Sequence, residues 1–186
     1  MRIIGGAAGG RKIRAPKGAA TRPTADRVRE AIFNMLGPLP PSTRVLDLYA
    51  GAGGLGLEAL SRGATEAVFV DRSGEAVRCI LENLRALGFS HRARVHRADV
   101  VPALGRLLKE GRRFDLVLLD PPYFGDEAAR ALSCLAGPAE GLLAEDAVLV
   151  VEHDRRMPLE HALGVLCRHD ERQYGDTVVS FYRRAA

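Results

Sequence analysis

Apolar segments with the length of β-strands alternate with segments of helical periodicity along most of this 186-residue chain. Strands separated by helices need crossover connections, which build a parallel sheet covered by helices on both faces. The sequence therefore predicts an α/β fold with one mostly parallel sheet. The predicted strands are Val45–Tyr49, Ala67–Val70, Ala93–Val95, Leu116–Leu119 and Val148–Val151, and the predicted helices are Leu55–Ser61, Glu75–Leu87, Val100–Lys109, Glu127–Leu135 and Leu159–Leu163.

The last part of the chain departs from this alternation. Two extended segments, Val165–Glu171 and Thr177–Tyr182, flank a turn signal at Tyr174–Gly175. Extended segments joined by a short turn that contains glycine are typical of a β-hairpin. We therefore predict a C-terminal antiparallel hairpin.

The first 40 residues form a basic segment of their own. Two short extended pieces, Arg2–Ile4 and Lys12–Arg14, predict a hairpin, and a helix follows with Thr24 as its N-cap and Gly37 as its end. Residues 1–36 hold eight basic and two acidic side chains, a net charge of +6, whereas the remainder carries −2. We predict a basic extension, residues 1–40, on a larger domain, residues 41–186. Such a basic arm suggests an anionic partner, most simply nucleic acid.

Composition excludes several other classes of protein. No segment has the roughly 20 largely apolar residues of a transmembrane helix, and the N-terminus is too short in apolar residues for a signal peptide. The three cysteines, Cys79, Cys134 and Cys167, are widely spaced without a CxxC motif, and the five histidines show no metal spacing. We therefore expect a cytoplasmic protein with no metal site, no disulfide framework and no membrane partner.

A glycine-rich loop follows the first strand of the alternating region. Val45–Leu60 is typical of a strand, a tight glycine loop and a helix, and Gly51, Gly53 and Gly56 form a GxGxxG pattern. Asp71 follows at the end of the next strand. A dinucleotide-binding loop has the same features, so this pattern alone fits either NAD or S-adenosylmethionine.

One further acid, Asp47, favours S-adenosylmethionine. Asp47 precedes the loop, where a carboxylate can face the positive methionyl end of that cofactor but would repel a pyrophosphate. Asp47 could instead cap the glycine loop. Asp99 is a candidate for the adenine amino group or for the N-cap of the helix that begins at Val100. The expected cofactor-binding residues are Asp47, Tyr49, Gly51, Gly53, Asp71, Arg72, Ala98 and Asp99.

The segment Asp120-Pro121-Pro122-Tyr123 directly follows a buried strand, and we expect these four residues to be catalytic. Ligands of open parallel sheets bind beyond the carboxyl ends of the strands. The exocyclic amine of a base is a poor nucleophile because its lone pair is spread into the ring. Asp120 and the carbonyl of Pro121 can accept its two hydrogens, and Tyr123 can stack on the base. Asp-Pro-Pro is also common turn chemistry, and whether Asp120 takes the proton stays open.

These motifs resemble those of class I methyltransferases that act on amino groups. The whole chain resembles the RsmD family of bacterial 16S rRNA guanine-N2 methyltransferases. Three further segments carry this narrower match: Arg2–Gly6 with the basic residues after it, Arg22–Asn34, and the tail Tyr174–Tyr182. The glycine loop departs from the family pattern, in which we expect Ser near Ala52 and Ala at Gly54.

The resemblance implies a Rossmann-like class I methyltransferase fold with seven strands, mostly parallel, and S-adenosylmethionine as the donor. It implies that the substrate is guanine-966 of 16S rRNA, in the 30S subunit or an assembly intermediate. It assigns cofactor roles to Asp47, Gly51, Asp71 and Asp99, and catalysis to Asp120–Tyr123. We expect a monomer, with ribosomal proteins helping to present the RNA.

The basic extension supplies the expected RNA contacts. One or two of its arginines can instead reach the carboxylate of the cofactor, and each can also be an ordinary solvated side chain. The expected RNA-binding residues are Arg2, Arg11, Lys12, Arg14, Arg22, Arg27 and Arg29.

Four other functions remain as alternatives. A DNA adenine-N6 methyltransferase would share Asp120–Tyr123 but usually needs a target-recognition region, for which this chain leaves little room. A protein glutamine methyltransferase more often has Asn at position 120. An NAD-dependent oxidoreductase fits the glycine loop but leaves Asp120–Tyr123 unexplained. A non-catalytic RNA-binding assembly factor fits the basic arm and would tolerate mutation of Asp120.

Overall fold

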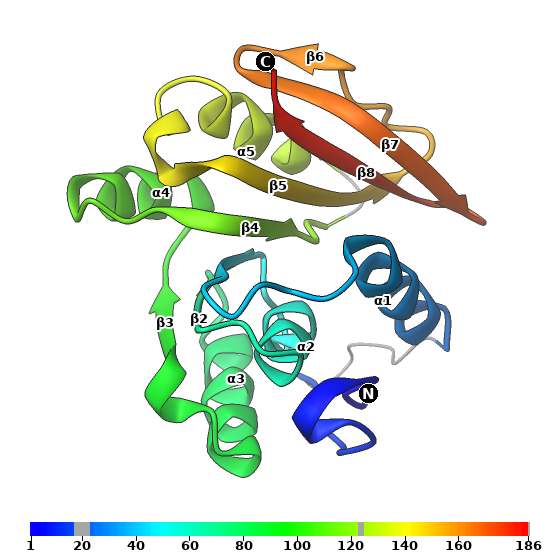
Figure 1. Ribbon diagram of the computed structural model, residues 1–186, viewed down its shortest axis with the longest axis vertical. Coiled ribbons are helices and arrows are strands. Elements are labelled where there is room, and N and C mark those ends of the chain that lie inside the picture. The colour runs from blue at the N-terminus through cyan, green and yellow to red at the C-terminus, as the bar shows by residue number, and fades with distance from the viewer. Residues whose placement is uncertain (17–22, 123–124, 186) are drawn as a thin grey trace.

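The computed structural model describes residues 1–16, 23–122 and 125–185, except for the side chains of residues 23–25. Its centre is an eight-stranded sheet with the order β3-β2-β1-β4-β5-β8-β7-β6 (Figure 1). The strands are β1 (Arg44–Leu48), β2 (Glu66–Asp71), β3 (Ala93–Arg97), β4 (Phe114–Leu119), β5 (Leu143–Asp154), β6 (Ala162–Leu163), β7 (Leu166–Tyr174) and β8 (Thr177–Arg184). The helices are α1 (Pro23–Leu36), α2 (Gly54–Ser61), α3 (Gly74–Leu87), α4 (Val100–Lys109) and α5 (Glu127–Leu135), with 3-10 turns η1 (Gly6–Ala8), η2 (Ser90–Arg92) and η3 (Glu140–Leu142).

Strands β1 to β5 are parallel, and β8, β7 and β6 continue the sheet in antiparallel pairing. Successive side chains of a strand point to opposite faces, so each strand contributes to two cores. One face packs against α1, α2 and α3, and the other against α4 and α5. The α/β class, the mostly parallel sheet and the C-terminal hairpin are therefore confirmed.

The predicted helix at Leu159–Leu163 is wrong, and the sheet has eight strands rather than seven. Residues Ala162–Leu163 form β6, which pairs with the start of β7. Gly164 makes the turn with a φ of 51°, in the left-handed region that favours glycine. Leu159 and Leu163 both pack against the α4–α5 side of the core, although the chain is extended there. A short apolar pattern of this kind does not separate helix from strand.

The predicted N-terminal hairpin is confirmed. Arg2 and Lys12 form an antiparallel bridge, and the Ile3 N–H donates to the carbonyl of Arg11 at 2.9 Å. Helix α1 begins at Pro23, so Thr24 lies inside its first turn and the predicted N-cap is wrong. Proline is favoured at a first helical position because it lacks the N–H that would have no partner there.

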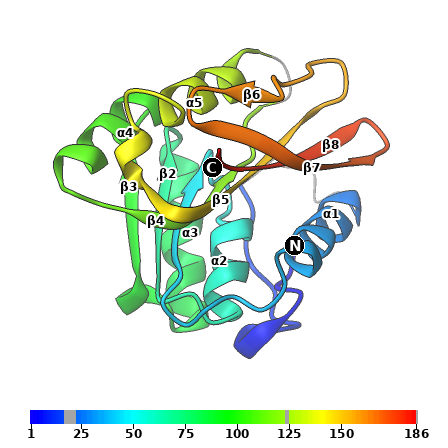
Figure 2. The same cartoon turned by 45° about the horizontal axis from the view of Figure 1, so that its top comes forward.

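The N-terminal segment packs against the rest of the molecule (Figures 1 and 2). Ile3 and Ile13 of the hairpin and Ile32 of α1 are buried in the same hydrophobic core as Leu57 of α2. The hairpin and α1 both lie beside α2 in the two views. The division of the chain into residues 1–40 and 41–186 stays a prediction.

The carboxyl ends of the parallel strands meet at one edge of the sheet. The strand order reverses between β1 and β4, because β2 and β3 lie on one side of β1 and β4 and β5 on the other. This is the place where open α/β sheets bind ligands. In the described part of the chain, no helix is long and apolar enough to cross a membrane. Nor do the described residues contain a group of three His, Cys, Asp or Glu side chains that could hold a metal ion.

Candidate active site

Two cavities open at the carboxyl ends of the parallel strands. The larger has a volume of about 630 Å³ and extends from the ends of β2 and β3 toward α4 and α5. The smaller has a volume of about 220 Å³ and lies toward α1, the N-terminal hairpin and α2. Tyr49, Gly51 and Asp120 line both cavities, so the two meet between the ends of β1 and β4.

Backbone geometry explains the glycine loop between β1 and α2. Gly51 and Gly53 have φ angles of 56° and 81°, which residues with a β-carbon rarely adopt. A β-carbon at Gly56 would lie 2.4 Å from the Phe69 ring, so α2 packs closely on β2 only because this position is glycine. Tyr49 also has a positive φ, 59°, a strain that is characteristic of functional sites. Gly53 caps α2 and contributes to neither cavity lining, unlike Gly51.

Asp47 is 1% exposed and lines the smaller cavity. Its Oδ2 accepts the backbone N–H of Gly56 at 2.8 Å. The pKa of Asp47 is raised to about 8. Burial is the largest cause and repulsion from Asp71 adds to it, whereas the hydrogen bond from Gly56 acts in the opposite direction. Asp47 therefore both caps the loop and lines the cavity. A cation bound in the cavity would favour the ionised carboxylate.

Asp71 and Asp99 line the larger cavity from the ends of β2 and β3. The carboxylate of Asp71 accepts the N–H groups of Gly51 and Ser73, each at 2.8 Å, which leaves capacity for ligand hydroxyls. Asp99 occupies the N-cap position of α4, but its side chain makes no capping hydrogen bond. The Ala98 N–H donates to the carbonyl of Asp71 at 3.0 Å, so an N–H for a ligand ring nitrogen must come from the following residues.

Asp120 lies at the junction of the two cavities. Its backbone N–H donates to the carbonyl of Leu48 at 3.4 Å, which fixes it beside the end of β1. Desolvation by surrounding protein, then repulsion from Glu152 and Asp47, holds the pKa of Asp120 well above its ordinary value. The Asp120 side chain is nevertheless accessible to solvent through the cavities, which weakens desolvation. Repulsion from the two acidic neighbours is therefore the main cause of its raised pKa. Pro121 and Pro122 line the larger cavity, and Tyr123 lies outside the described residues.

Four charged residues that line the cavities were not predicted from the sequence as cofactor-binding or catalytic. Glu152 follows the apolar segment of β5 and lines the smaller cavity, and Glu127 and Arg130 of α5 line the larger one. Arg29 of α1 was predicted mainly as an RNA contact and lines the smaller cavity. The signal for Glu152 was present, because an acid directly after a buried strand is the pattern that identified Asp120.

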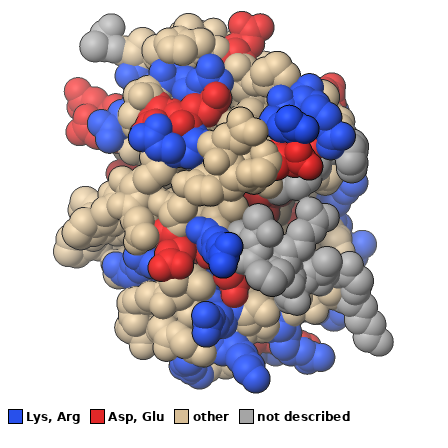
Figure 3. Space-filling model, turned by 90° about the vertical axis from the view of Figure 1, so that its right-hand side faces the viewer, with Lys and Arg blue, Asp and Glu red and all other residues tan. Residues whose placement is uncertain are grey.

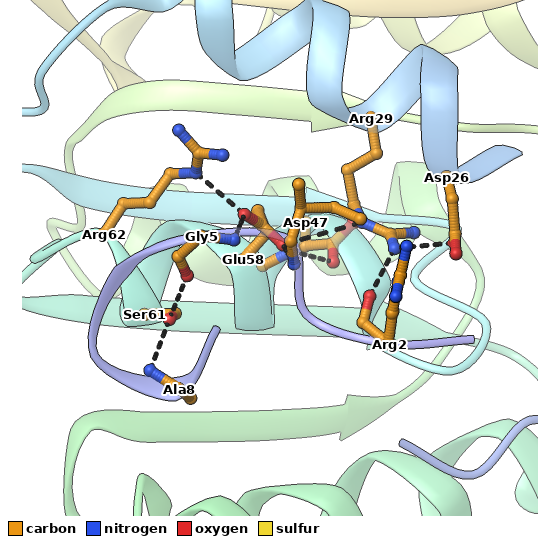
Figure 4. A network of polar contacts seen from close by, with 11 residues as sticks. Arg2, Gly5, Ala8, Asp26, Arg29, Asp47, Glu58, Ser61 and Arg62 are labelled. Atoms are coloured by element: carbon orange, nitrogen blue, oxygen red, sulfur yellow. Dashed lines mark hydrogen bonds and ion pairs between the residues drawn. The ribbon is translucent and has the colours of Figure 1, made fainter. Parts of the chain in front are cut away.

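Arg29 differs from the other described basic residues of the extension because it is only 4% exposed. Its guanidinium donates to the carbonyl of Arg2 at 2.6 Å and to Asp26 at 2.8 Å, and its Nε lies 3.7 Å from Glu58 (Figure 4). Its Nη1 faces the glycine loop, 3.3 Å from where a β-carbon on Gly54 would be. This placement agrees with the alternative that one arginine of the extension reaches the cofactor.

The other predicted RNA contacts lie on the surface where they are described. Arg2, Arg11, Lys12, Arg14 and Arg27 are exposed. Arg14 pairs with Glu82 at 2.5 Å. On the face drawn in Figure 3, basic side chains form several patches with acidic side chains between them. Arg22 lies outside the described residues, and an RNA-binding role for any of these side chains stays a prediction.

Comparison with known proteins places the chain in a family. A family model described as "Conserved hypothetical protein 95" matches residues 1–183. "Putative rRNA methyltransferase YlbH" of Bacillus subtilis (strain 168) is 42% identical over 184 residues, 99% of each chain. "Ribosomal RNA small subunit methyltransferase D" of Escherichia coli (strain K12) is 34% identical over 186 residues, 100% of this chain and 91% of that protein.

A solved structure agrees with the sequence matches. The structure described as "Putative methyltransferase yhhF from Escherichia coli" has a TM-score of 0.84 and 32% identity, and the match covers 100% of this chain and 98% of that one. The family match spans nearly the whole chain, and the resemblance seen in the motifs is therefore confirmed. The chain belongs to the family described as conserved hypothetical protein 95, which is the RsmD family.

Proposed function

We propose that this protein transfers a methyl group from S-adenosylmethionine to the exocyclic N2 amine of a guanine in 16S rRNA of the small ribosomal subunit. Family resemblance suggests guanine-966. The observation that carries the proposal is the position of Asp120 at the junction of the two cavities. A methyl donor that fills both cavities would present its reactive centre at that junction.

The residues of both cavities fit S-adenosylmethionine, which carries an activated methyl group on a sulfonium. In the larger cavity, Asp71 is suited to the ribose hydroxyls and Asp99 to the adenine amino group. In the smaller cavity, Asp47 and Arg29 supply the opposite charges that an α-ammonium and an α-carboxylate need. A pyrophosphate in the place of the methionyl group would meet the carboxylate of Asp47, which argues against NAD.

Asp120 and Pro121 are suited to position the amine. The carboxylate of Asp120 and the carbonyl of Pro121 would accept its two hydrogens and direct the nitrogen lone pair toward the methyl group. Holding the reacting atoms roughly 3–3.5 Å apart supplies much of a rate enhancement of this kind. The raised pKa of Asp120 also makes its ionised form a better proton acceptor than an aspartate with the ordinary pKa.

The substrate class rests on the family and on the basic extension. The matched relatives named above include a small-subunit ribosomal RNA methyltransferase. The extension that carries the exposed basic residues also contributes Met1, Ala15, Pro16 and Arg29 to the lining of the smaller cavity. We further propose that the protein acts as a monomer in the cytoplasm and that ribosomal proteins help to present the target.

Transfer of radiolabel from S-adenosylmethionine tests the proposal. The acceptors are 30S subunits lacking the modification, deproteinised 16S rRNA and duplex DNA. We expect label in RNA that digests to N2-methylguanosine, and a loss on the order of 100-fold or more with Asp120→Ala. Asp146→Ala, an exposed change near the start of β5, is the matched control and should keep full activity. Label in DNA would support an adenine methyltransferase, and cofactor binding without transfer would support an assembly factor.

A further inference from the structure

Glu152 and Asp120 lie side by side at the carboxyl ends of neighbouring strands. Strands β4 and β5 are parallel, with Leu119 opposite Val151, so the next residue of each strand is also paired in position. Neighbouring strands lie about 4.8 Å apart, and paired residues point to the same face of the sheet. Both acids line the smaller cavity, and Glu152 contributes to the raised pKa of Asp120. Two hydrogen-bond acceptors are therefore adjacent where the reaction takes place.

Asp47 also lines this cavity and lies on the same face of the sheet, two residues nearer the amino ends of the strands. Asp47 is paired with Leu118 of β4, and Leu118 precedes Asp120 by two residues. Repulsion among three carboxylates is unfavourable unless donors or cations bind between them. The cationic methionyl end of the cofactor would satisfy Asp47. Asp120 and Glu152 are the two acids nearest the position proposed for the acceptor amine.

Given the proposed function, the Watson–Crick edge of guanine matches this pair of acceptors. That edge carries the N1–H donor directly beside the N2 amine, whereas adenine has an unprotonated N1 beside its amine. We propose that Glu152 is a specificity-determining residue that accepts the N1–H of the target guanine while Asp120 holds the N2 amine. An adenine would place a nitrogen lone pair against the Glu152 carboxylate.

The expected selectivity follows from the strength of such contacts. Hydrogen bonds to a charged acceptor are roughly twice as strong as neutral ones. A site built to bind a donor also discriminates against an analogue that lacks the donor, because its own polar group is then left unpaired. Extruded bases are commonly recognised through this edge. The alternative role for Glu152 is binding of the α-ammonium of the cofactor. In that role Glu152 would not affect the selectivity for the target base.

A base substitution that removes the N1–H donor separates the two roles. The substrate is 16S rRNA, assembled into 30S particles, with either guanine or 2-aminopurine at the mapped target position. 2-Aminopurine keeps the exocyclic amine but has an unprotonated N1. Wild-type protein, Glu152→Gln and Glu145→Gln are compared for kcat/KM on both substrates and for the Kd of S-adenosylmethionine. Glu145 is an exposed residue near the other end of β5 and gives a matched control.

Wild-type protein and Glu145→Gln should prefer guanine by about 10- to 100-fold. In Glu152→Gln the amide can turn its NH₂ group toward N1, so this preference should shrink by about tenfold or more with an unchanged cofactor Kd. An unchanged preference for guanine in Glu152→Gln would overturn the proposal. If this variant also binds S-adenosylmethionine more weakly, Glu152 binds the α-ammonium of the cofactor instead. If Glu152→Gln does not fold, equal rates of wild-type protein on the two bases would overturn it. Failure of wild-type protein to methylate the guanine substrate would instead refute the proposed function itself.

Discussion

The buried carboxylate of Glu58 in α2 accepts the backbone N–H of Ile4 at 2.7 Å and so ties the N-terminal hairpin to the helix that follows the glycine loop. The same side chain accepts the Gly5 N–H and the Nε–H of Arg62, both at 2.8 Å (Figure 4). Its exposure is 0%. The basic extension is thus held directly against the cofactor-binding part of the molecule through one acid.

The first prediction concerns this attachment. Glu58→Gln replaces one acceptor oxygen with an NH₂ group that faces backbone donors, and it leaves Arg29 without its buried counter-charge. We expect the free energy of unfolding to fall by roughly 3 kcal/mol, the scale for breaking a buried ion pair. Urea denaturation measures it. Glu82→Gln removes only the exposed pair with Arg14 and should cost less than about 1 kcal/mol. Equal effects of the two substitutions would contradict the assigned role of Glu58.

A second prediction concerns Arg29 as the partner of the cofactor carboxylate. Arg29→Lys shortens the side chain and removes the planar fork, so S-adenosylmethionine and S-adenosylhomocysteine should bind about tenfold more weakly or worse. 5′-Methylthioadenosine lacks the carboxylate and should bind both proteins equally. Calorimetric titration gives the three affinities. Arg27→Lys on the exposed side of α1 is the control, and a loss that includes methylthioadenosine would mean that Arg29 acts only through the fold.

The third prediction follows from the raised pKa of Asp47. Its ordinary pKa is 3.8, and burial raises it to about 8, so between about pH 4 and 8 the folded protein holds a proton that the unfolded chain releases. Stability therefore falls as pH rises through this window. Asp47→Asn keeps an acceptor for the Gly56 N–H but cannot ionise. The free energy of unfolding of Asp47→Asn minus that of wild-type protein should increase steadily from about pH 4 to pH 8 and stay constant above about pH 8. Urea denaturation across this range checks it, and a pH-independent difference would refute the buried, protonated state.

The sequence predicted the parallel part of the fold well because its signals are local and repeated. Several strands of the α/β region contain an apolar run, and an acid suited to a ligand ends or follows the strand, as at Asp71, Asp99 and Asp120. Glu152 obeys the same rule and was still missed, because nothing in the sequence shows that β5 lies beside β4. That adjacency is a property of the sheet order alone.

Other features depended on contacts between distant segments. Arg29 follows five other arginines of the basic segment. Only the packing of α1 against α2 shows that it is buried and lines the smaller cavity. The strand at Ala162–Leu163 could not be distinguished from a helix, because its extended form depends on pairing with β7. In both cases tertiary structure decides the role of a residue whose local pattern is ambiguous.

The last prediction contrasts two helical glycines with opposite roles. At Gly56 a β-carbon would lie 2.4 Å from the Phe69 ring and 2.9 Å from Oδ2 of Asp47, whereas at Gly105 in α4 nothing lies within 4 Å. Gly105→Ala should therefore stabilise the protein by about 0.5–1 kcal/mol, since alanine favours the helix. Gly56→Ala has the same propensity gain but must displace α2 from β2, at a cost of about 1–3 kcal/mol or more. It should also weaken cofactor binding, because the added β-carbon would disturb the hydrogen bond between the Gly56 N–H and Asp47. Thermal and urea denaturation of the two variants, with cofactor titration, compare them. If Gly56→Ala were as benign as Gly105→Ala, the close contact between α2 and β2 would not be what fixes the glycine loop.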